Sequence, residues 1–459
     1  MNFRNTESVA PTAVDPYKTI KWLIWLYFFL LIYEGALRKW IVPSLANPLL
    51  IIRDPVVILI YVQALAKGAF PEDGFVAGII GLGILTFLIS LVTGTGNLFV
   101  SLFGWRTNFL HLPLIFLMPK VLSPKDVRRL CIGLLISALP MALLVMYQFK
   151  AGPTAWVNVG VGGSEGSQLD VGFGKIRPPG TFSFTNGLAN YISLVAACLL
   201  YAVLDRKYYP RWLVFSAAPA TILMIVVSAS RATVSSVVIS IGVLVLICLR
   251  RPGYIGSSFK FVLLALPGLY LVTSLSVFQE GMMVHTTRFG ETGGGVQHGI
   301  IERALGDYID GFSAAAEAPL FGWGLGIGTN AGAGMLSGGV RSFLLAEGEW
   351  ARVVKESGPI LGLGFLFFRV SMAFYIGLIA LYAFGRKNPL ALLIFSSAFL
   401  LVIGGQFGQP TALGFAVFGA GLCLAAANEE TKIEPNASAV IEQGRKIRGR
   451  SVFAEMLHR

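Results

Sequence analysis

The feature that most constrains this chain is a series of apolar runs, each close to twenty residues long, that recur along its length. A helix needs about 20 apolar residues to cross the hydrocarbon core of a bilayer. Only 13% of the 459 residues are charged, whereas about 25% is usual in soluble domains. These features exclude a soluble enzyme, a disordered protein and a fibrous protein, and a β-barrel would show short alternating segments instead. We therefore predict an all-α, polytopic transmembrane helix bundle.

We expect about twelve spans in this bundle. Residues 1–19 are a polar N-terminal segment, residues 20–427 form the transmembrane domain, and residues 428–459 are a flexible tail. The predicted spans are 20–37, 49–66, 75–94, 107–122, 130–149, 184–204, 212–228, 233–249, 261–278, 358–384, 389–405 and 411–427.

The basic residues predict the orientation. With the N-terminus inside, 22 of the 36 lysines and arginines fall in the inner loops and the two terminal segments. Cytoplasmic loops of membrane proteins carry this excess, so we expect a multi-pass protein with both termini in the cytoplasm. The same rule explains the net charge of +12 without nucleic acid as a partner. Two outer loops are long, residues 150–183 and 279–357, and loops of such length usually carry function.

Arginines are frequent on this outer face for a chain so poor in charge. Arg231 is the most informative, because it lies in the very short outer turn "SASRAT" between two spans. A charge at a membrane boundary is costly unless it is paired or faces a polar cavity; the alternative is that Arg231 snorkels to the headgroups. Arginine forks bind phosphate oxygens bidentately. The further candidates for binding an anionic substrate are Arg177, Arg288, Arg303 and Arg352.

The second long loop predicts two local structures. Residues 299–319 form an amphipathic helix, because Ile301, Leu305, Ile309 and Phe312 recur at helical spacing while Arg303, Asp307 and Asp310 share another face. Such a helix would lie on the membrane, and its polar face would either serve a site or be merely solvated. The glycines of "APLFGWGLGIGTN" lack the strand and the Lys-Ser/Thr pair of a phosphate loop. We expect a tight loop there.

The end of this loop, "LLAEGEWARVVKESGP", brings four charged residues together in sequence. On an unbroken helix, Glu349, Arg352 and Glu356 share one face and Glu347 points away, unless Gly348 breaks the helix. We interpret the first three residues as a helix-surface ion network; substrate contact is the alternative.

Charged residues within the predicted spans form a second group. Arg53 and Asp54 are expected to pair with Glu34 or Arg38, with a lipid-headgroup cavity as the alternative. The four histidines show no metal-like spacing. Metal-independent chemistry without a cofactor, on an anionic substrate, fits these residues best.

Four segments together resemble a known family. "RPPGTFSFTNGLANY", "SASRAT", "ERALGDYIDGFSAAAEAPLFGWGLGIG" and "AEGEWARVVKESGPILG" are similar, in order and spacing, to segments of the O-antigen ligase and O-antigen polymerase (Wzy-type) superfamily of bacterial membrane glycosyltransferases. The resemblance covers residues 175–365 approximately. It implies an inner-membrane enzyme whose donor is a glycan on undecaprenyl pyrophosphate, presented at the periplasmic face.

The resemblance also implies roles for individual residues. Arg231 and Arg303 would bind the pyrophosphate and stabilise it as the leaving group, with Arg177 at the cavity entrance. An acceptor hydroxyl would attack the anomeric carbon with inversion. The ligase branch carries a His-Asn pair where this chain has Glu347 and Gly348; Glu347 would replace the histidine as general base.

This departure favours a polymerase that joins lipid-linked repeat units for a surface polysaccharide or exopolysaccharide. The implied partners are the lipid bilayer, a chain-length regulator and other polysaccharide-assembly proteins. The first alternative is a ligase that transfers glycan to lipid A–core or to protein. The second is a transporter or flippase for lipid-linked sugars, which the unequal loops of the two halves disfavour.

Overall fold

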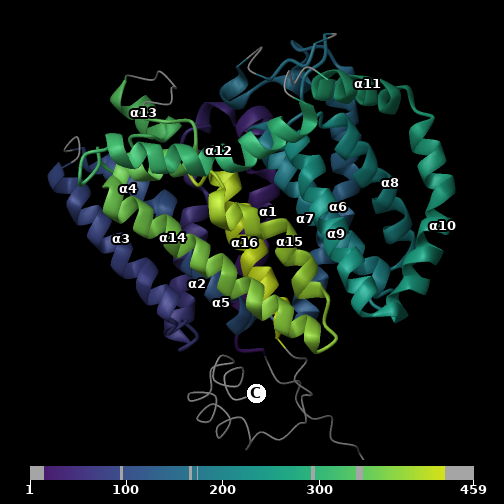
Figure 1. Cartoon of the computed structure of the whole chain (residues 1–459), viewed down its shortest axis with the longest axis horizontal. Coiled ribbons are helices and arrows are strands. Elements are labelled where there is room, and N and C mark those ends of the chain that lie inside the picture. The colour runs from purple at the N-terminus through teal and green to yellow at the C-terminus, as the bar shows by residue number, and fades with distance from the viewer. Residues whose placement is uncertain are drawn as a thin grey trace, which may run out of the picture. The chain divides into compact units, whose positions relative to one another are not determined.

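The computed structural model describes residues 15–93, 97–164, 168–172, 174–290, 295–337 and 345–428. Side chains of residues 257–258, 260–264, 288–290 and 295–304 lie outside the described part. Within these residues the regular elements are helices, and β pairing is limited to one bridge between Asp170 and Ile176. The all-α prediction is therefore confirmed (Figure 1).

Sixteen α-helices make up the described chain. They are α1 (Lys18–Ala36), α2 (Arg53–Ala66), α3 (Gly74–Thr93), α4 (Leu98–Trp105), α5 (Pro113–Val121), α6 (Pro124–Lys150), α7 (Thr185–Leu204), α8 (Arg211–Val227), α9 (Arg231–Arg250), α10 (Ile255–Thr273), α11 (Ser276–Gly290), α12 (Gly295–Glu317), α13 (Asn330–Leu336), α14 (Glu349–Gly385), α15 (Leu390–Gly404) and α16 (Pro410–Ala427).

Eight helical segments of the described chain are long and apolar enough to cross a membrane, and α8 and α15 are shorter apolar helices. This supports a multi-pass membrane protein but does not confirm twelve spans. The expected span 107–122, in particular, is not one continuous helix. A π-helical segment, Arg106–Leu110, follows α4 and precedes the nine-residue α5. Single-turn π segments inside helices are frequently found at functional sites.

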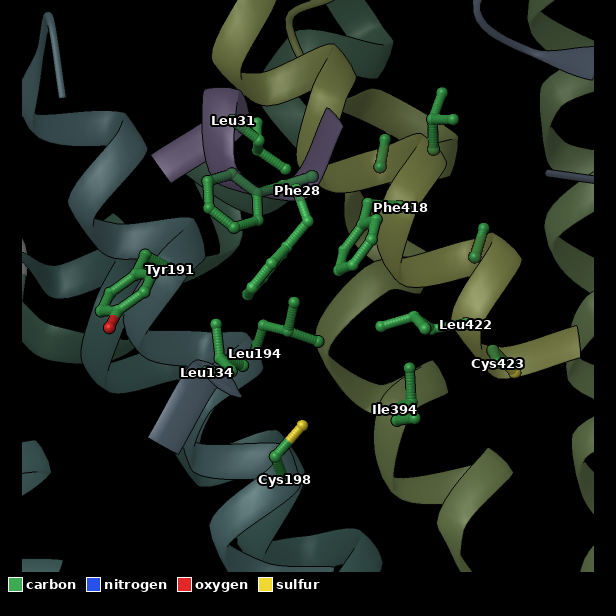
Figure 2. Packing of buried hydrophobic residues seen from close by; sticks show 14 of the residues in the cluster. Phe28, Leu31, Leu134, Tyr191, Leu194, Cys198, Ile394, Phe418, Leu422 and Cys423 are labelled. Carbon is green, nitrogen blue, oxygen red and sulfur yellow. The ribbon is translucent and has the colours of Figure 1, made fainter. Parts of the chain in front are cut away.

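The core of the bundle forms where α1, α6, α7, α15 and α16 pack together (Figure 2). Phe28 of α1 stacks on Phe418 of α16, with ring centroids 5.1 Å apart. Helix α16 is buried on nearly all sides, and its glycines let neighbouring side chains come close: a Cβ at Gly421 would meet the Met118 sulfur at 2.4 Å. Small residues have this role in membrane bundles, where packing replaces the hydrophobic drive.

Helix α14 is broken at Gly358, whose φ of +80° is accessible mainly to glycine, and Pro359 follows. The backbone of the glycine-rich loop, residues 318–330, packs directly into this break. Trp323 N–H donates to the Lys355 carbonyl at 2.8 Å, and Gly324 N–H donates to the Glu356 carbonyl at 2.9 Å. The glycines therefore permit close backbone contact, as expected for a tight loop.

Helix α12 confirms the predicted amphipathic helix and lies across one end of the bundle, over α14 (Figure 1). Its inner side packs Tyr308 on Trp350, with ring centroids 4.7 Å apart. The apolar residues Leu305, Ile309 and Phe312 are about half exposed. An exposed apolar stripe on such a helix suits contact with the membrane interface.

Candidate functional site

A small polar pocket lies where the N-terminal ends of α13, α14 and α16 meet the C-terminal end of α15. Its cavity volume is about 20 Å³, which is enough for one water molecule. The residues that line it are Gly328, Thr329, Asn330, Ala346, Glu347, Glu349, Arg352, Gln406, Gly408 and Gln409. Three predicted site residues are therefore found here. Glu347 and Arg352 line the pocket, and Glu356 forms an ion pair with Arg352.

Arg352 is the centre of a buried ion network beneath the pocket. Its guanidinium forms two hydrogen bonds of 3.0 Å with the Glu349 carboxylate and one of 2.6 Å with Glu356. Nη2 also donates to the Asn108 side-chain oxygen at 2.9 Å. All four side chains are at least 96% buried. The expected ion network exists, but it is buried, because the π segment and the glycine-rich loop lie against this face of α14 and bond to Arg352 and Glu356.

Arg369 extends the network across the break in α14. It donates to Glu349 at 2.9 Å and to the backbone carbonyls of Val402 and Gly405 at 2.9 Å each. Its guanidinium also lies 3.6 Å from the centre of the Phe407 ring. Arg369 thus fixes the turn between α15 and α16, residues 405–409, against α14.

Gly348 separates Glu347 from the helix that follows. It is the N-cap residue of α14, with φ −74° and ψ 143°, so the helix begins at Glu349. A Cβ at Gly348 would lie 2.3 Å from the Asp307 carboxylate. Because the helix starts after this glycine, Glu347 and Glu349 both reach the same pocket, the outcome that an unbroken helix would forbid.

The turn between α15 and α16 contributes two pocket residues that sequence reasoning missed. Gln406 donates to the Glu347 carbonyl oxygen at 3.1 Å, and Gln409 donates to the Gln406 side-chain oxygen. Asn186, at the start of α7, donates to Gln409 at 3.3 Å. The sequence could have indicated them, because two glutamines at the boundary between apolar spans are expected to pair with other polar groups.

The stretch that contains Asn186 is anchored through its backbone to α1, to the π-helical segment Leu37–Ile41 that follows α1, and to α6. Gly180 has φ +62°, and its carbonyl accepts hydrogen bonds from Lys39 at 2.6 Å and Gln148 at 3.2 Å. A Cβ at Gly35 would lie within 2.6 Å of the backbone of residues 181–183. The "GTF" residues therefore hold the start of α7 in place. Arg177 lies upstream and does not line the pocket.

A second buried polar cluster joins α1 and α2. Arg53 donates to Glu34 at 3.1 Å, as expected, and Arg38 donates to the same carboxylate at 3.4 Å. Asp54 differs from the prediction: its partners are Arg106 and His111 rather than Glu34 or Arg38. Asp54 and Arg53 are adjacent on a helix, so their side chains diverge and reach different neighbours.

The π segment connects the two clusters. Arg106, its first residue, forms the ion pair with Asp54, while Asn108 accepts from Arg352. Over two residues the segment presents one side chain to each cluster. Such a wide helical turn redirects side chains that a regular α-helix would place elsewhere.

The other predicted arginines lie apart from the pocket or outside the described side chains. Arg231 is the first residue of α9, after Ala229 with φ +47° and Ser230, whose hydroxyl caps the helix by accepting from Thr233 N–H at 3.4 Å. It does not line the pocket. The backbones of Arg288 and Arg303 belong to α11 and α12; their side chains lie outside the described residues.

Charge distinguishes this pocket from an anion site. Glu347, Glu349 and Glu356 carry three formal negative charges around it, and Arg352 and Arg369 carry two positive charges. Both arginines already bind carboxylates. The residues at the pocket therefore favour hydroxyl groups and proton acceptance over phosphate. In the part of the chain that is described, no three His, Cys, Asp or Glu residues are placed to hold a metal.

Asp307 of α12 is a titratable group at the edge of this region. Burial raises the pKa of its carboxyl to about 6, and the nearby negative charges of Glu349 and Asp310 act in the same direction. Its Oδ1 accepts a long hydrogen bond, 3.4 Å, from Trp350 N–H in the first turn of α14. Asp307 thus docks α12 on the helix that carries Arg352.

Comparison with known proteins gives no match to a protein-family model and no similar curated protein.

Proposed function

We propose that the chain is a polymerase that joins undecaprenyl-pyrophosphate-linked repeat units at the periplasmic face of a bacterial inner membrane. The observation that supports it is a convergence of segments. Asn186, Gly328 and Glu347 come from three of the four segments that resemble the family, and all three lie at or beside one pocket. Residues of an active site must lie within reach of one reacting group, and this convergence is what the resemblance requires.

In this proposal different residues serve the leaving group and the attacking hydroxyl, which act on opposite faces of one anomeric carbon. Arg231 and Arg303 bind the pyrophosphate of the donor and stabilise the negative charge that develops as it leaves. Glu347 accepts the proton of the attacking sugar hydroxyl, and that hydroxyl oxygen bonds to the anomeric carbon on the face opposite the leaving group. The product is an inverted glycosidic bond.

The buried network defines the role that we assign to Arg352 and Glu356. Their charges compensate each other, and Glu356 also accepts from Gly328 N–H at 2.9 Å. We therefore propose that Arg352 and Glu356 hold the glycine-rich loop and the Glu347 segment in position. Other residues of the site contact the substrate. Arg177 and Arg288 remain proposed contacts to the donor at the periphery.

The proposal is tested by deleting the gene and profiling surface glycan together with lipid-linked intermediates. Single repeat units on the carrier, with long polymer absent, are the expected result. Long polymer retained on the carrier would identify a ligase, and repeat units trapped on the inner leaflet would identify a flippase. Either outcome overturns the polymerase proposal.

Residue roles are tested by complementing the deletion with variants. Arg231→Ala, Arg303→Ala and Glu347→Gln should abolish polymer while protein remains in the membrane, since each removes a group that acts on the reacting atoms. The matched controls are Arg129→Ala and Glu317→Gln, because both side chains are largely exposed. Full-length polymer from all three site variants would refute the proposed site.

A further inference from the structure

Three amide side chains beside Glu347 form a connected array. Asn186 donates to Gln409, Gln409 donates to Gln406, and Gln406 donates to the Glu347 backbone carbonyl. They come from two elements distant in sequence, the start of α7 and the turn between α15 and α16. We propose that this amide array, Asn186, Gln406 and Gln409, binds the hydroxyl groups of a sugar residue and positions one of them at Glu347. The inference rests on the proposed function and names its acceptor-recognition site.

The amides retain hydrogen-bonding capacity after these contacts. Each primary amide has two N–H donors and a carbonyl oxygen with two lone pairs. The array uses one N–H of each residue and one lone pair on the side-chain oxygen of Gln406 and of Gln409. All three side chains are partly exposed, and Gln406 and Gln409 line the pocket. A sugar hydroxyl both donates and accepts, so it matches a surface that offers both functions. Fixed cations or carboxylates alone would match only one.

The turn that carries the glutamines is rigid. Phe407, between them, is fully buried against the Arg369 guanidinium, and the Gly405 carbonyl accepts from Arg369 at 2.9 Å. Gln406 and Gln409 lie on either side of this buried ring and are both partly exposed. A recognition surface held in place before binding loses little entropy when the ligand arrives.

Charge and size indicate what part of a substrate fits. The surroundings carry a formal negative excess, which disfavours phosphate. The narrow pocket has room for a group of about the size of one water molecule. A single hydroxyl enters at Glu347, and the sugar ring lies at the mouth over the amides.

The test measures binding of one defined probe, the free repeat-unit oligosaccharide released from the host's own surface polysaccharide. Saturation-transfer NMR on the detergent-solubilised full chain gives its Kd. We expect Asn186→Ala and Gln409→Ala each to weaken binding about tenfold, which corresponds to one lost hydrogen bond. The control is Gln279→Ala, an exposed glutamine on α11. Thermal unfolding identifies variants that fail to fold; Asn186→Ser then replaces Asn186→Ala.

The polymer assay separates this inference from the proposed function. Loss of polymer in the deletion strain together with unchanged oligosaccharide Kd in both amide variants would overturn the amide array alone. An unaffected polymer in the deletion strain would overturn the proposed function. A raised KM for the acceptor with nearly unchanged kcat in Gln409→Ala would support recognition, because a merely structural defect would lower kcat through loss of folded enzyme.

Discussion

Arg352 and Glu349 face each other as a fork: Nε and Nη2 of the arginine donate to the two carboxylate oxygens, both at 3.0 Å. The two residues are three positions apart on α14, and both are almost entirely buried. Arg369 binds the same carboxylate from beyond the break at Gly358. A single carboxylate therefore ties together the two parts of a broken helix.

Arg352→Lys should destabilise the protein although it keeps the charge. One ammonium cannot reproduce the planar fork or reach Glu349, Glu356 and Asn108 together, so at least one hydrogen bond to a charged group is lost. We expect a cost of about 1.5–3 kcal/mol, measured as the midpoint of thermal unfolding in detergent. Arg129→Lys, at an exposed ion pair, should change little. Equal midpoints for both variants would contradict a stabilising fork.

Gly358→Ala should prevent the glycine-rich loop from docking. The residue has φ +80°, and a Cβ there would lie 2.2 Å from the Leu320 carbonyl oxygen. Positive φ alone costs about 1–3 kcal/mol for a residue with a side chain, and the backbone contact cannot yield easily. Folded yield after size-exclusion chromatography is the measurement. Gly364→Ala on the same helix, where a Cβ would meet nothing within 4 Å, should give a normal yield.

The docking of α12 should weaken as pH rises through about 6. The pKa of Asp307 is raised from its usual value to about 6, chiefly by burial. An acid with a raised folded-state pKa contributes stability that is complete below its unfolded pKa and is lost as the carboxyl ionises. The thermal midpoint should therefore fall between about pH 4, near the usual pKa of an aspartate, and about pH 7, just above the raised pKa.

Asp307→Asn should remove this part of the pH dependence, because asparagine stays neutral and can still accept from Trp350 N–H. Asp310→Asn is the matched control, since Asp310 is exposed on the same helix. A pH profile of Asp307→Asn identical to that of the unmodified chain would show that another group titrates.

Asp54→Asn should destabilise the junction between α2 and the π segment. The carboxylate pairs with Arg106 and accepts from His111 at 3.0 Å, so neutralising it leaves Arg106 buried without its counter-charge. Breaking such a pair costs about 3–5 kcal/mol. Proteolysis of the detergent-solubilised chain at increasing temperature measures the loss. An unaltered profile, matching that of Glu72→Gln at an exposed position, would contradict this role.

Much of the architecture could be predicted because hydrophobicity and periodicity are local. Apolar length indicated the membrane helices, and the 3.6-residue spacing from Ile301 to Phe312 indicated α12. The interruption at Arg106–Leu110 was missed, since a π turn depends on what Arg106 and Asn108 contact across the bundle.

The candidate site was predictable only in part. Glu347, Arg352 and Glu356 were identified from their charges in an apolar setting, whereas Gln406, Gln409 and Asn186 were not, because uncharged amides are ordinary in loops. Arg369 is a charge inside a predicted span, and its partner Glu349 lies 20 residues away. Helix periodicity does not predict contact at that separation across a break.

The amino-acid sequence by itself determined the class of this protein, an all-helical membrane bundle with an amphipathic helix in its second long loop. It could do so because the transfer of apolar side chains out of water depends on composition and local spacing. Only the tertiary structure decided which charges pair. Asp54 pairs with Arg106 rather than with a residue closer in sequence. Because the helix begins after Gly348, Glu347 and Glu349 line the same pocket. The physical reason is that ion pairs and hydrogen bonds act over about 3 Å, so the packing of distant segments selects each partner.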